Sequence, residues 1–287
     1  MGGRIIPCSY VGAQAGLCMK QPGCGTVLGV FHHGWYLDCG GQVLLLHNTQ
    51  YGRVPFGIGV DQFEETLAYQ KQLEGTSVYW DSRELVISET EERIELSPAE
   101  ETLWRPFQKS ALQWMAPLAE NLLEQEGNGY LRELLPYRNT LIEGDVLELT
   151  GNLYLTRSAD ALANFFLALN SGREEGLAAA LHKMIGFGPG LTPSLDDWLV
   201  GFLYVLLRQQ KTVLTGQICR LVCELAEKRT NRISAAYLKS AAKHMYFQTL
   251  QRAGEAQCPN DLRHLMAIGS SSGCDMLTGM LFAIEFL

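Results

Sequence analysis

Short apolar runs separated by glycines dominate the first hundred residues. The runs are rich in aromatic and β-branched side chains, which is typical of half-buried strands. We expect strands at Val27–Phe31, Trp35–Leu37, Val43–His47, Val78–Trp80, Leu85–Ile87 and Arg93–Leu96. The glycines between them favour tight turns. The pattern therefore predicts the hairpins of a compact barrel or sandwich, interrupted by a helix over Asp61–Leu73 with Asp61 as its N-cap.

Helical spacing of apolar residues follows this region. Ser97–Glu100 is a predicted helix start, because serine caps helices and proline suits the first helical position. The helix should run to about Gln125, and Glu126–Gly129 should end it. One hairpin is expected, pairing Asp145–Leu149 with Leu153–Leu155 through a turn at Gly151–Asn152. Further helices are predicted at Ala159–Leu169, Glu174–Ile185, Asp196–Arg208, Gly216–Lys228, Ser234–Ala253, Asn260–Ala267 and Asp275–Phe286.

The change of pattern predicts an α+β protein. A β-rich N-terminal part, barrel-like or sandwich-like and carrying one or two helices, precedes a mainly α-helical C-terminal domain. The boundary should lie between Gly127 and Arg157, and we divide the chain into residues 1–140 and residues 141–287.

Composition narrows the possible functions. The 287 residues are 47% hydrophobic and 19% charged, as in ordinary globular proteins. The net charge of -8 argues against a nucleic-acid or anionic membrane partner. No run reaches the roughly 20 apolar residues that a membrane span needs. An anionic ligand stays possible, because backbone amides can bind an anion within an acidic protein.

Cysteine usage favours reduced thiols and a cytoplasmic location. The eight cysteines include no C-x-x-C pair, and no secretory leader is expected. Cys219 and Cys223 share a predicted helix face, where packing is favoured over metal binding. The histidines, His32 and His33 in a hairpin and His182 and His244 on helices, have no metal-ligand spacing. We expect neither a metal nor a cofactor.

The segment Gly186–Asp197 carries the most unusual pattern. Three glycines alternate with Phe187 and Pro189, so that the backbone can turn tightly and present its N–H groups. Ser194 is placed to cap the helix that follows. Because a helix N-terminus carries about half a positive charge, this loop suits a phosphate or carboxylate.

Asp196 and Asp197 complicate this interpretation. They could bind a cation, polarise an amide N–H or cap their own helix. A plain helix–loop–helix connection is the alternative, with Ser194 and Asp197 forming a capping box. The density of Gly, Pro, Thr, Ser and Asp favours a ligand site, because a plain connection seldom needs so many special backbone positions.

A second segment repeats the first. Ser194-x-x-Asp197-x-Leu199-x-Gly201-x-Leu203 matches Ser272-x-x-Asp275-x-Leu277-x-Gly279-x-Leu281 position for position. A glycine inside a helix costs about 1 kcal/mol relative to alanine. Two of them at matching offsets indicate a close helix crossing with both N-termini at one pocket, although chance agreement is a live alternative.

Two weaker candidates lie elsewhere. Asn231 could recognise an amide and Arg232 could clamp a carboxylate or phosphate, or both could belong to an ordinary helix junction. Arg53 could reach a carboxylate, although an exposed hairpin arginine is the simpler interpretation.

The chain resembles the AllH-like family, a subunit of oxamate carbamoyltransferase from anaerobic allantoin breakdown and thus purine degradation. Gly186–Gly201 has the family pattern Gly-x-Gly-Pro-Gly-Leu-Thr-Pro-Ser-x-Asp-Asp-x-Leu-x-Gly. Gly269–Gly279 has the second pattern, Gly-x-x-Ser-Gly-x-Asp-x-Leu-x-Gly, and Ser234–Tyr246 is similar too. The resemblance is clear over residues 175–285 and looser near residues 25–60. Many members of the family are uncharacterised.

The resemblance implies one subunit of a hetero-complex that converts oxalurate and phosphate into oxamate and carbamoyl phosphate. Such an enzyme needs donors for phosphate and for the oxyanion, and it must position the amine. On this hypothesis the catalytic residues are Asp196, Asp197 and Thr192. The small anionic metabolite would contact Gly188, Gly190, Leu191, Ser194, Asn231, Arg232, Ser272, Gly273 and Asp275. The competing hypothesis is a non-catalytic metabolite-binding or scaffold subunit.

Overall fold

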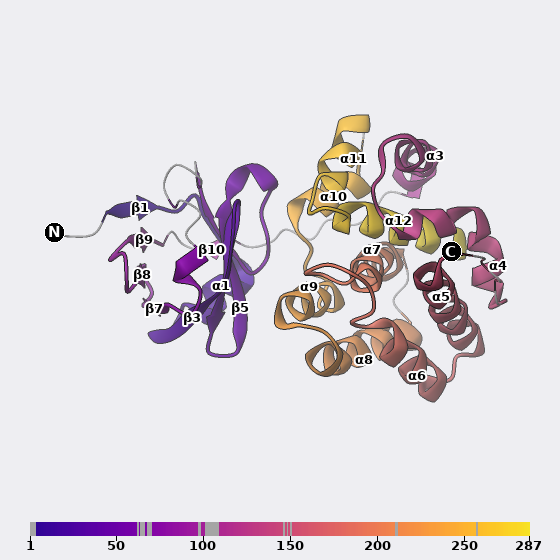
Figure 1. Ribbon diagram of the computed structural model, residues 1–287, viewed down its shortest axis with the longest axis horizontal. Coiled ribbons are helices and arrows are strands. Elements are labelled where there is room, and N and C mark those ends of the chain that lie inside the picture. The colour runs from indigo at the N-terminus through magenta and orange to yellow at the C-terminus, as the bar shows by residue number, and fades with distance from the viewer. Residues whose placement is uncertain are drawn as a thin grey trace. The chain divides into compact units, whose positions relative to one another are not determined.

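The computed structural model describes residues 4–61, 63, 67, 71–96, 99–100, 109–145, 147, 149, 151–209, 212–256 and 258–287. The chain forms two compact units, Met1–Trp104 and Arg105–Leu287. Strands make up most of the first unit and helices make up the second (Figure 1). The predicted α+β class is therefore confirmed.

The first unit is a curled sheet of ten strands within the described residues. Its order is β1-β9-β8-β7-β3-β4-β5-β6-β2-β10. The strands are β1 Ile5–Pro7, β2 Tyr10–Gly12, β3 Gly23–Phe31, β4 Gly34–Cys39, β5 Gln42–Asn48, β6 Gly57–Val60, β7 Ser77–Trp80, β8 Glu84–Ile87, β9 Arg93–Glu95 and β10 Ala99–Glu100. Among the described residues, the helical segments between these strands include α1 Ala13–Cys18, η1 Thr49–Tyr51 and η2 Lys71–Leu73.

Strands β1 and β2 lie near opposite ends of the sheet order, although only Cys8 and Ser9 separate them. The Cys8 N–H donates to the Glu95 carbonyl in β9 (3.1 Å), and the Ser9 N–H donates to the Gly59 carbonyl in β6 (2.8 Å). Two residues span at most about 7 Å. The sheet must therefore curl until its two ends meet, as in a barrel.

Alternation of apolar and polar residues places one face of these strands in the core. Trp35, Leu37, Leu46, Ile58 and Val78 are fully buried there.

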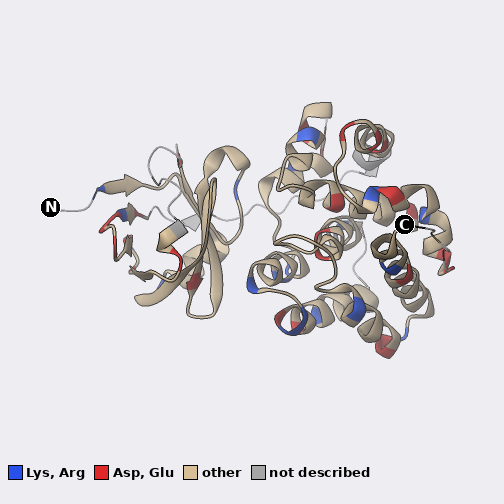
Figure 2. Cartoon of the chain, viewed as in Figure 1, with Lys and Arg blue, Asp and Glu red and all other residues tan. Residues whose placement is uncertain are grey.

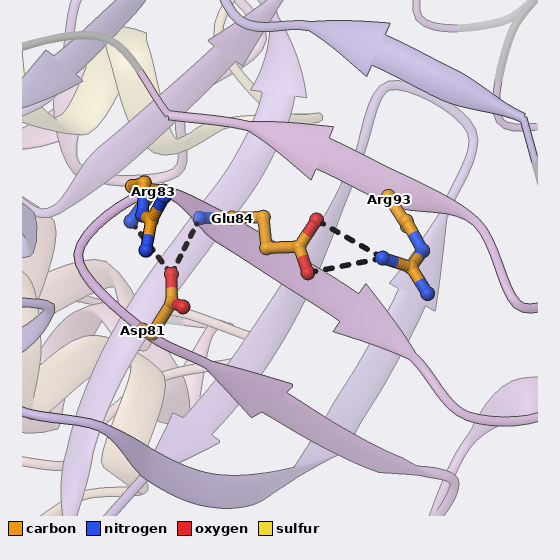
Figure 3. A network of polar contacts seen from close by, with 4 residues as sticks. All are labelled: Asp81, Arg83, Glu84 and Arg93. Atoms are coloured by element: carbon orange, nitrogen blue, oxygen red, sulfur yellow. Dashed lines mark hydrogen bonds and ion pairs between the residues drawn. The ribbon is translucent and has the colours of Figure 1, made fainter.

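Polar contacts also hold together the part of the sheet from β7 to β9 (Figure 3). Asp81 accepts the N–H groups of Arg83 (2.7 Å) and Glu84 (3.0 Å), which forms the β7–β8 turn. Glu84 then pairs across the sheet with Arg93, at 3.2 Å between Oε1 and Nη1.

The second unit is helical. It comprises α3 Lys109–Glu126, η3 Leu131–Tyr137, α4 Arg138–Glu143, α5 Leu153–Ser171, α6 Glu174–Met184, α7 Ser194–Gln209, α8 Val213–Arg229, α9 Arg232–Ala242, α10 Gln248–Gly254, α11 Pro259–Met266 and α12 Ser272–Phe286. Helix α7 is buried from Ser194 to Leu207, because other helices surround it. An aromatic cluster of Phe165, Phe166, Trp198, Phe202 and Phe282 fills the space between α5, α7 and α12. None of the described helices is long and apolar enough to cross a bilayer.

The division between the units lies before the predicted boundary at residues 140 and 141. Helix α3 packs against α11 and α12, and α4 packs against α5 and α12. These contacts assign residues 109–143 to the helical unit. The sequence pattern alone did not reveal these contacts, because amphipathicity shows which face of a helix is buried and not which element covers that face.

Three secondary-structure predictions were wrong. Ala99–Glu100 is strand β10, not a helix start, and Ser97 and Pro98 lie outside the described residues. Leu153–Leu155 begins helix α5, and Asn152 caps that helix by accepting the N–H groups of Tyr154 and Leu155 at 3.1 and 3.2 Å. The hairpin expected there is absent from the described residues, although part of Asp145–Leu149 lies outside them.

The third error concerns the single helix expected over Ser234–Ala253. It is two helices, α9 and α10, because His244 between them has a left-handed backbone (φ 59°). His244 therefore lies at a helix junction and not on a helix. Most of the predicted helix Asp61–Leu73 lies outside the described residues.

Candidate functional site

Helices α7 and α12 cross at two glycines. A Cβ built on Gly201 would lie 1.9 Å from the Met276 carbonyl oxygen, and one on Gly279 would lie 2.0 Å from the Trp198 carbonyl oxygen. Each glycine therefore lies directly against the backbone of the other helix. The close crossing predicted from the repeated Ser-x-x-Asp-x-Leu-x-Gly pattern is present.

This crossing brings several helix beginnings together. Side chains from the first turns of α7, α9 and α12 and from the first two turns of α5 meet beneath the Gly186–Pro193 loop. Helix N-termini carry partial positive charge, so their convergence favours negative charge or hydrogen-bond acceptors. Three buried aspartates, Asp196, Asp197 and Asp275, lie at this convergence.

Asp196 is saturated with donors from the protein. Its Oδ1 accepts the Gly186 N–H at 2.7 Å, and its Oδ2 accepts the hydroxyls of Thr230 and Ser234, both at 2.6 Å. Burial raises its pKa, and the three hydrogen bonds oppose that rise. Asp196 thus ties the loop to the α8–α9 junction, and none of these contacts leaves it poised to act on a ligand.

Asp197 lies in a ladder of hydroxyls that joins α7 to α12. Its Oδ2 accepts the Thr192 hydroxyl at 2.9 Å, and Thr192 Oγ1 lies 2.9 Å from Ser272 Oγ. Burial raises the pKa of Asp197 well above its usual range, while the Thr192 and Ser272 hydroxyls lower it. This ladder brings together three predicted site residues from the two repeated segments.

Asp275 is the counterpart of Asp197 on α12. Its Oδ1 accepts the Leu131 N–H at 3.1 Å, and burial raises its pKa to about 6. Gly129 lies against it, since a Cβ there would be 2.9 Å from Asp275 Oδ1. The Gly127–Gly129 segment therefore covers the start of α12, as the Gly186–Gly190 loop covers the start of α7.

Four buried polar atoms at this convergence have no hydrogen-bond partner among the described residues: Tyr154 OH, Ser158 Oγ, Ser194 Oγ and Asp275 Oδ2. They are neighbours. Burial raises the pKa of Tyr154, the hydroxyls of Ser194 and Ser158 lower it, and Asp275 raises it. Ser194 lies close to Asp275 as well, because the Ser194 hydroxyl lowers the pKa of that carboxyl. Because Ser194 Oγ is unpartnered, neither the predicted Ser194 cap nor the alternative capping box is formed.

The loop adopts backbone conformations that favour glycine. Gly186, Gly188 and Gly190 have φ values of 83°, 129° and 102°. A Cβ on Gly188 would lie 2.5 Å from the Ser194 nitrogen and 3.1 Å from Tyr154 OH. Gly188 therefore allows the loop to lie on the start of α7, directly over the unpartnered atoms.

Asn231 holds the outer part of the loop. Its Nδ2 donates to the Leu191 carbonyl at 2.6 Å, while its Oδ1 caps α9 by accepting the N–H groups of Ile233 and Ser234. Leu191 is exposed. Asn231 thus serves the helix junction, as its alternative interpretation expected, and it also positions the candidate loop.

The remaining candidates lie at the margin of the convergence or away from it. Arg232 is exposed at the start of α9. Gly273 is a packing residue, because a Cβ there would lie 1.7 Å from the Leu265 carbonyl oxygen. Arg53 lies over the Tyr10 ring in the first unit, 5.7 Å from its centroid.

No group of three or more His, Cys, Asp or Glu side chains among the described residues is arranged to hold a metal ion.

In Figure 2 basic and acidic residues are interspersed along the helices of the second unit.

Sequence reasoning missed Tyr154, Ser158, Thr230 and Ser234. The hydroxyls of Thr230 and Ser234 flank Asn231 and Arg232, so the polar segment itself pointed to them. Tyr154 was hidden by the mistaken strand at Leu153–Leu155. Asn152 two residues earlier was the available signal, since asparagine is a strong N-cap residue.

The helical unit is thus defined by two crossed helices whose N-terminal turns share one buried polar cluster. Residues 184–284 match the family model described as oxamate carbamoyltransferase subunit AllH. The match covers both repeated segments and confirms the resemblance that the sequence patterns indicated. No solved structure matches the chain significantly.

Proposed function

We propose that the chain is a subunit of an oxamate carbamoyltransferase-type complex and binds a small anionic metabolite at the start of α7. The observation that carries this proposal is the meeting of two matched segments: Thr192 before α7 and Ser272 on α12 are in hydrogen-bond contact at 2.9 Å. The oxamate carbamoyltransferase family description supports a complex with other subunits. All eight cysteines are free, which suits a cytoplasmic protein.

The reaction transfers a carbamoyl group. A phosphate oxygen attacks the ureido carbon of oxalurate, the bond from that carbon to the oxamate nitrogen breaks, and that nitrogen takes a proton. The site must therefore position two anions, stabilise an oxyanion and supply a proton. In the proposal, N–H groups of Gly188, Gly190 and Thr192 face the ligand.

The surroundings of the aspartates separate their proposed roles. Asp196 positions the loop, since its two oxygens already accept three donors. Asp197 is the better candidate for the proton donor, because burial raises its pKa well above the usual range and so favours the protonated carboxyl. Thr192 orients that carboxyl through its 2.9 Å hydrogen bond.

The test uses the assembled complex. Asp197→Asn and Thr192→Ala should each lower the rate of carbamoyl phosphate formation from oxalurate and phosphate. Removal of a general acid typically costs 10²–10⁴-fold, and loss of the orienting hydroxyl should cost less. Asp261→Asn in the first turn of α11 is the matched control and should leave the rate unchanged. Unchanged turnover in both test variants would sink the catalytic proposal.

A metabolite-binding or scaffold subunit is the second candidate function. It is favoured by the lack of any lysine or arginine among the groups that shift the pKa values of Asp196, Asp197 and Asp275 in the described residues. Phosphate activation would then come from a companion subunit. Co-purification with companion subunits, together with binding but no turnover by this chain alone and full turnover of the Asp197→Asn complex, would support this function over the first.

A further inference from the structure

The four unpartnered atoms beneath the loop require an explanation. Ser158, Ser194 and Asp275 are each 0% exposed, and the Tyr154 hydroxyl is also buried. A buried polar atom without a partner is costly, and native proteins have few of them. The four atoms come from α5, α7 and α12, and Ser194 lies close to both Tyr154 and Asp275 without a hydrogen bond forming between them. The cluster can therefore accept hydrogen bonds from, and donate them to, a further polar group.

The atoms offer a mixed set of donors and acceptors. The Tyr154, Ser158 and Ser194 hydroxyls can each donate one hydrogen, whereas an ionised Asp275 Oδ2 can only accept. A complementary group must present N–H or O–H hydrogens to Asp275 and an acceptor oxygen to the hydroxyls. A primary carboxamide or the terminal ureido group has both, an NH₂ and a carbonyl oxygen on one carbon.

Charge argues against a phosphate or carboxylate at the same point. Asp275 Oδ2 belongs to the cluster, and Asp197 lies close enough for the two carboxyls to raise the pKa of Asp197 further. An anion here would therefore meet the buried carboxylates of Asp275 and Asp197.

We propose that the Tyr154–Ser158–Ser194–Asp275 cluster binds the carboxamide or ureido end of the metabolite. The NH₂ group donates to Asp275 Oδ2, and the carbonyl oxygen accepts from the Ser194 and Tyr154 hydroxyls. The anionic end then points to the glycine loop outside the cluster. This inference rests on the proposed function, and it assigns the two ends of that ligand to different parts of the site.

The test compares oxamate with oxalate, which has a carboxylate in place of the carboxamide. Binding of each to the purified full-length chain is measured by titration calorimetry at pH 7.5, above the Asp275 pKa of about 6. Oxamate should bind at least about tenfold more tightly, because hydrogen bonds to charged groups are the stronger ones.

Asp275→Asn makes the test specific. The asparagine oxygen can still accept the Leu131 N–H, while its NH₂ replaces the acceptor Oδ2 with a donor. The variant should lose the preference for oxamate or reverse it. Ser194→Ala should weaken oxamate about tenfold, since its hydroxyl no longer meets the carbonyl oxygen. Asp261→Asn on α11 and Tyr137→Phe in η3 are the controls and should keep the wild-type ratio of affinities.

The outcomes separate this inference from the proposed function. If oxamate and oxalate bind equally, or if Asp275→Asn keeps the oxamate preference while remaining folded by circular dichroism, the carboxamide assignment is wrong and the proposed function stands. If oxamate, oxalate, oxalurate and carbamoyl phosphate all fail to bind the chain or its complex, the ligand site itself is wrong. A crystal structure with only an ordered water on the four atoms in the presence of bound oxamate would also overturn the assignment.

Discussion

The starts of α7 and α12 have the same sequence pattern and different surroundings. At α7, the neighbouring Asp196 accepts three protein donors and Asp197 lies in the Thr192–Ser272 ladder. At α12, one oxygen of Asp275 accepts the Leu131 N–H and the other has no partner within the described residues. The shared pattern therefore encodes the packing of the two helices, while the chemistry depends on what the surrounding segments donate to each carboxylate.

The comparison also changes how the loop is understood. Converging helix N-termini alone would suit an anion. Here three aspartates already lie at those termini, so their carboxyl groups offset part of the positive potential that would otherwise attract an anion. The open hydrogen-bonding capacity lies on three hydroxyls, those of Tyr154 and Ser158 on α5 and Ser194 on α7, and on one carboxylate oxygen of Asp275 on α12, so it is neutral or acidic in character.

The largest effect on stability is expected at Gly201 and Gly279, the matched glycines at which α7 and α12 cross. Replacing Gly201 and Gly279 together by alanine should lower the free energy of unfolding by about 4 kcal/mol or more, because each Cβ would overlap the opposite backbone. Gly216→Ala in α8 is the matched control, since its Cβ would meet nothing within 4 Å. It should stabilise the protein by up to about 1 kcal/mol. Chemical denaturation measures both, and a double variant as stable as this control would refute the close crossing.

The substitution Asp196→Ala tests the start of α7, where the carboxylate accepts three hydrogen bonds from the protein. It leaves the Gly186 N–H and the hydroxyls of Thr230 and Ser234 without their acceptor, which should cost about 3 kcal/mol of unfolding free energy. In the Thr230→Val, Ser234→Ala background the same substitution should cost less, since two of the orphaned donors are gone. If Asp196→Ala lowers the free energy of unfolding equally in the two backgrounds, the hydrogen bonds from Thr230 and Ser234 do not stabilise the protein through Asp196.

The pH dependence of stability tests the start of α12, where only one oxygen of Asp275 accepts a hydrogen bond within the described residues. Because the folded-state pKa of Asp275 is raised to about 6 from 3.8, folding favours its protonated form. Stability from this group is present at low pH and falls as the pH rises from about 4 to about 6, by about 2 kcal/mol. The difference in unfolding free energy between wild type and Asp275→Asn should therefore change by that amount between pH 4 and pH 7. A constant difference would exclude the raised pKa.

The smallest effect is expected at Tyr154. Without ligand, Tyr154→Phe removes a buried hydroxyl that has no partner among the described residues, so the free energy of unfolding should change by no more than about 0.5 kcal/mol. Ser234→Ala, which removes a hydroxyl bonded to Asp196 at 2.6 Å, should cost about 1 kcal/mol or more. Thermal unfolding of the two variants measures this difference in stability. If Tyr154→Phe lowers the free energy of unfolding as much as Ser234→Ala does, the Tyr154 hydroxyl has a hydrogen-bond partner in the free protein.

Sequence patterns predicted the parts of the fold that local physics controls. Periodicity and turn residues predicted the strands β3, β4, β5, β7, β8 and β9 and the helices α6, α7, α8, α11 and α12. Strands β1, β2 and β6 were missed, because each is only three or four residues long and shows too few positions for a periodic pattern. Ala99–Glu100 became a strand beside β2 despite a local helix signal, which shows tertiary pairing overriding propensity.

The candidate site was predictable to a similar extent. The repeated Ser, Asp and Gly positions indicated the crossing, since such spacing places them on one helix face. The hydrogen-bond partners of Asp196 and Asp275 were not predictable, because Leu131, Thr230 and Ser234 lie on segments that only the packed structure brings near. Spacing along one helix carries no information about donors from another.

The curled sheet of the first unit constrains the order in which that unit can form during synthesis. Ile5–Gly12 leaves the ribosome early, yet Tyr10 pairs with Gly59 and Ile5 pairs with Arg93. The first strands must therefore wait for partners that are translated much later, and contacts so distant in sequence slow folding. The pairing of β1 with β9 is then a late event, and until β9 has been translated β1 has an unpaired strand edge that can associate with other chains.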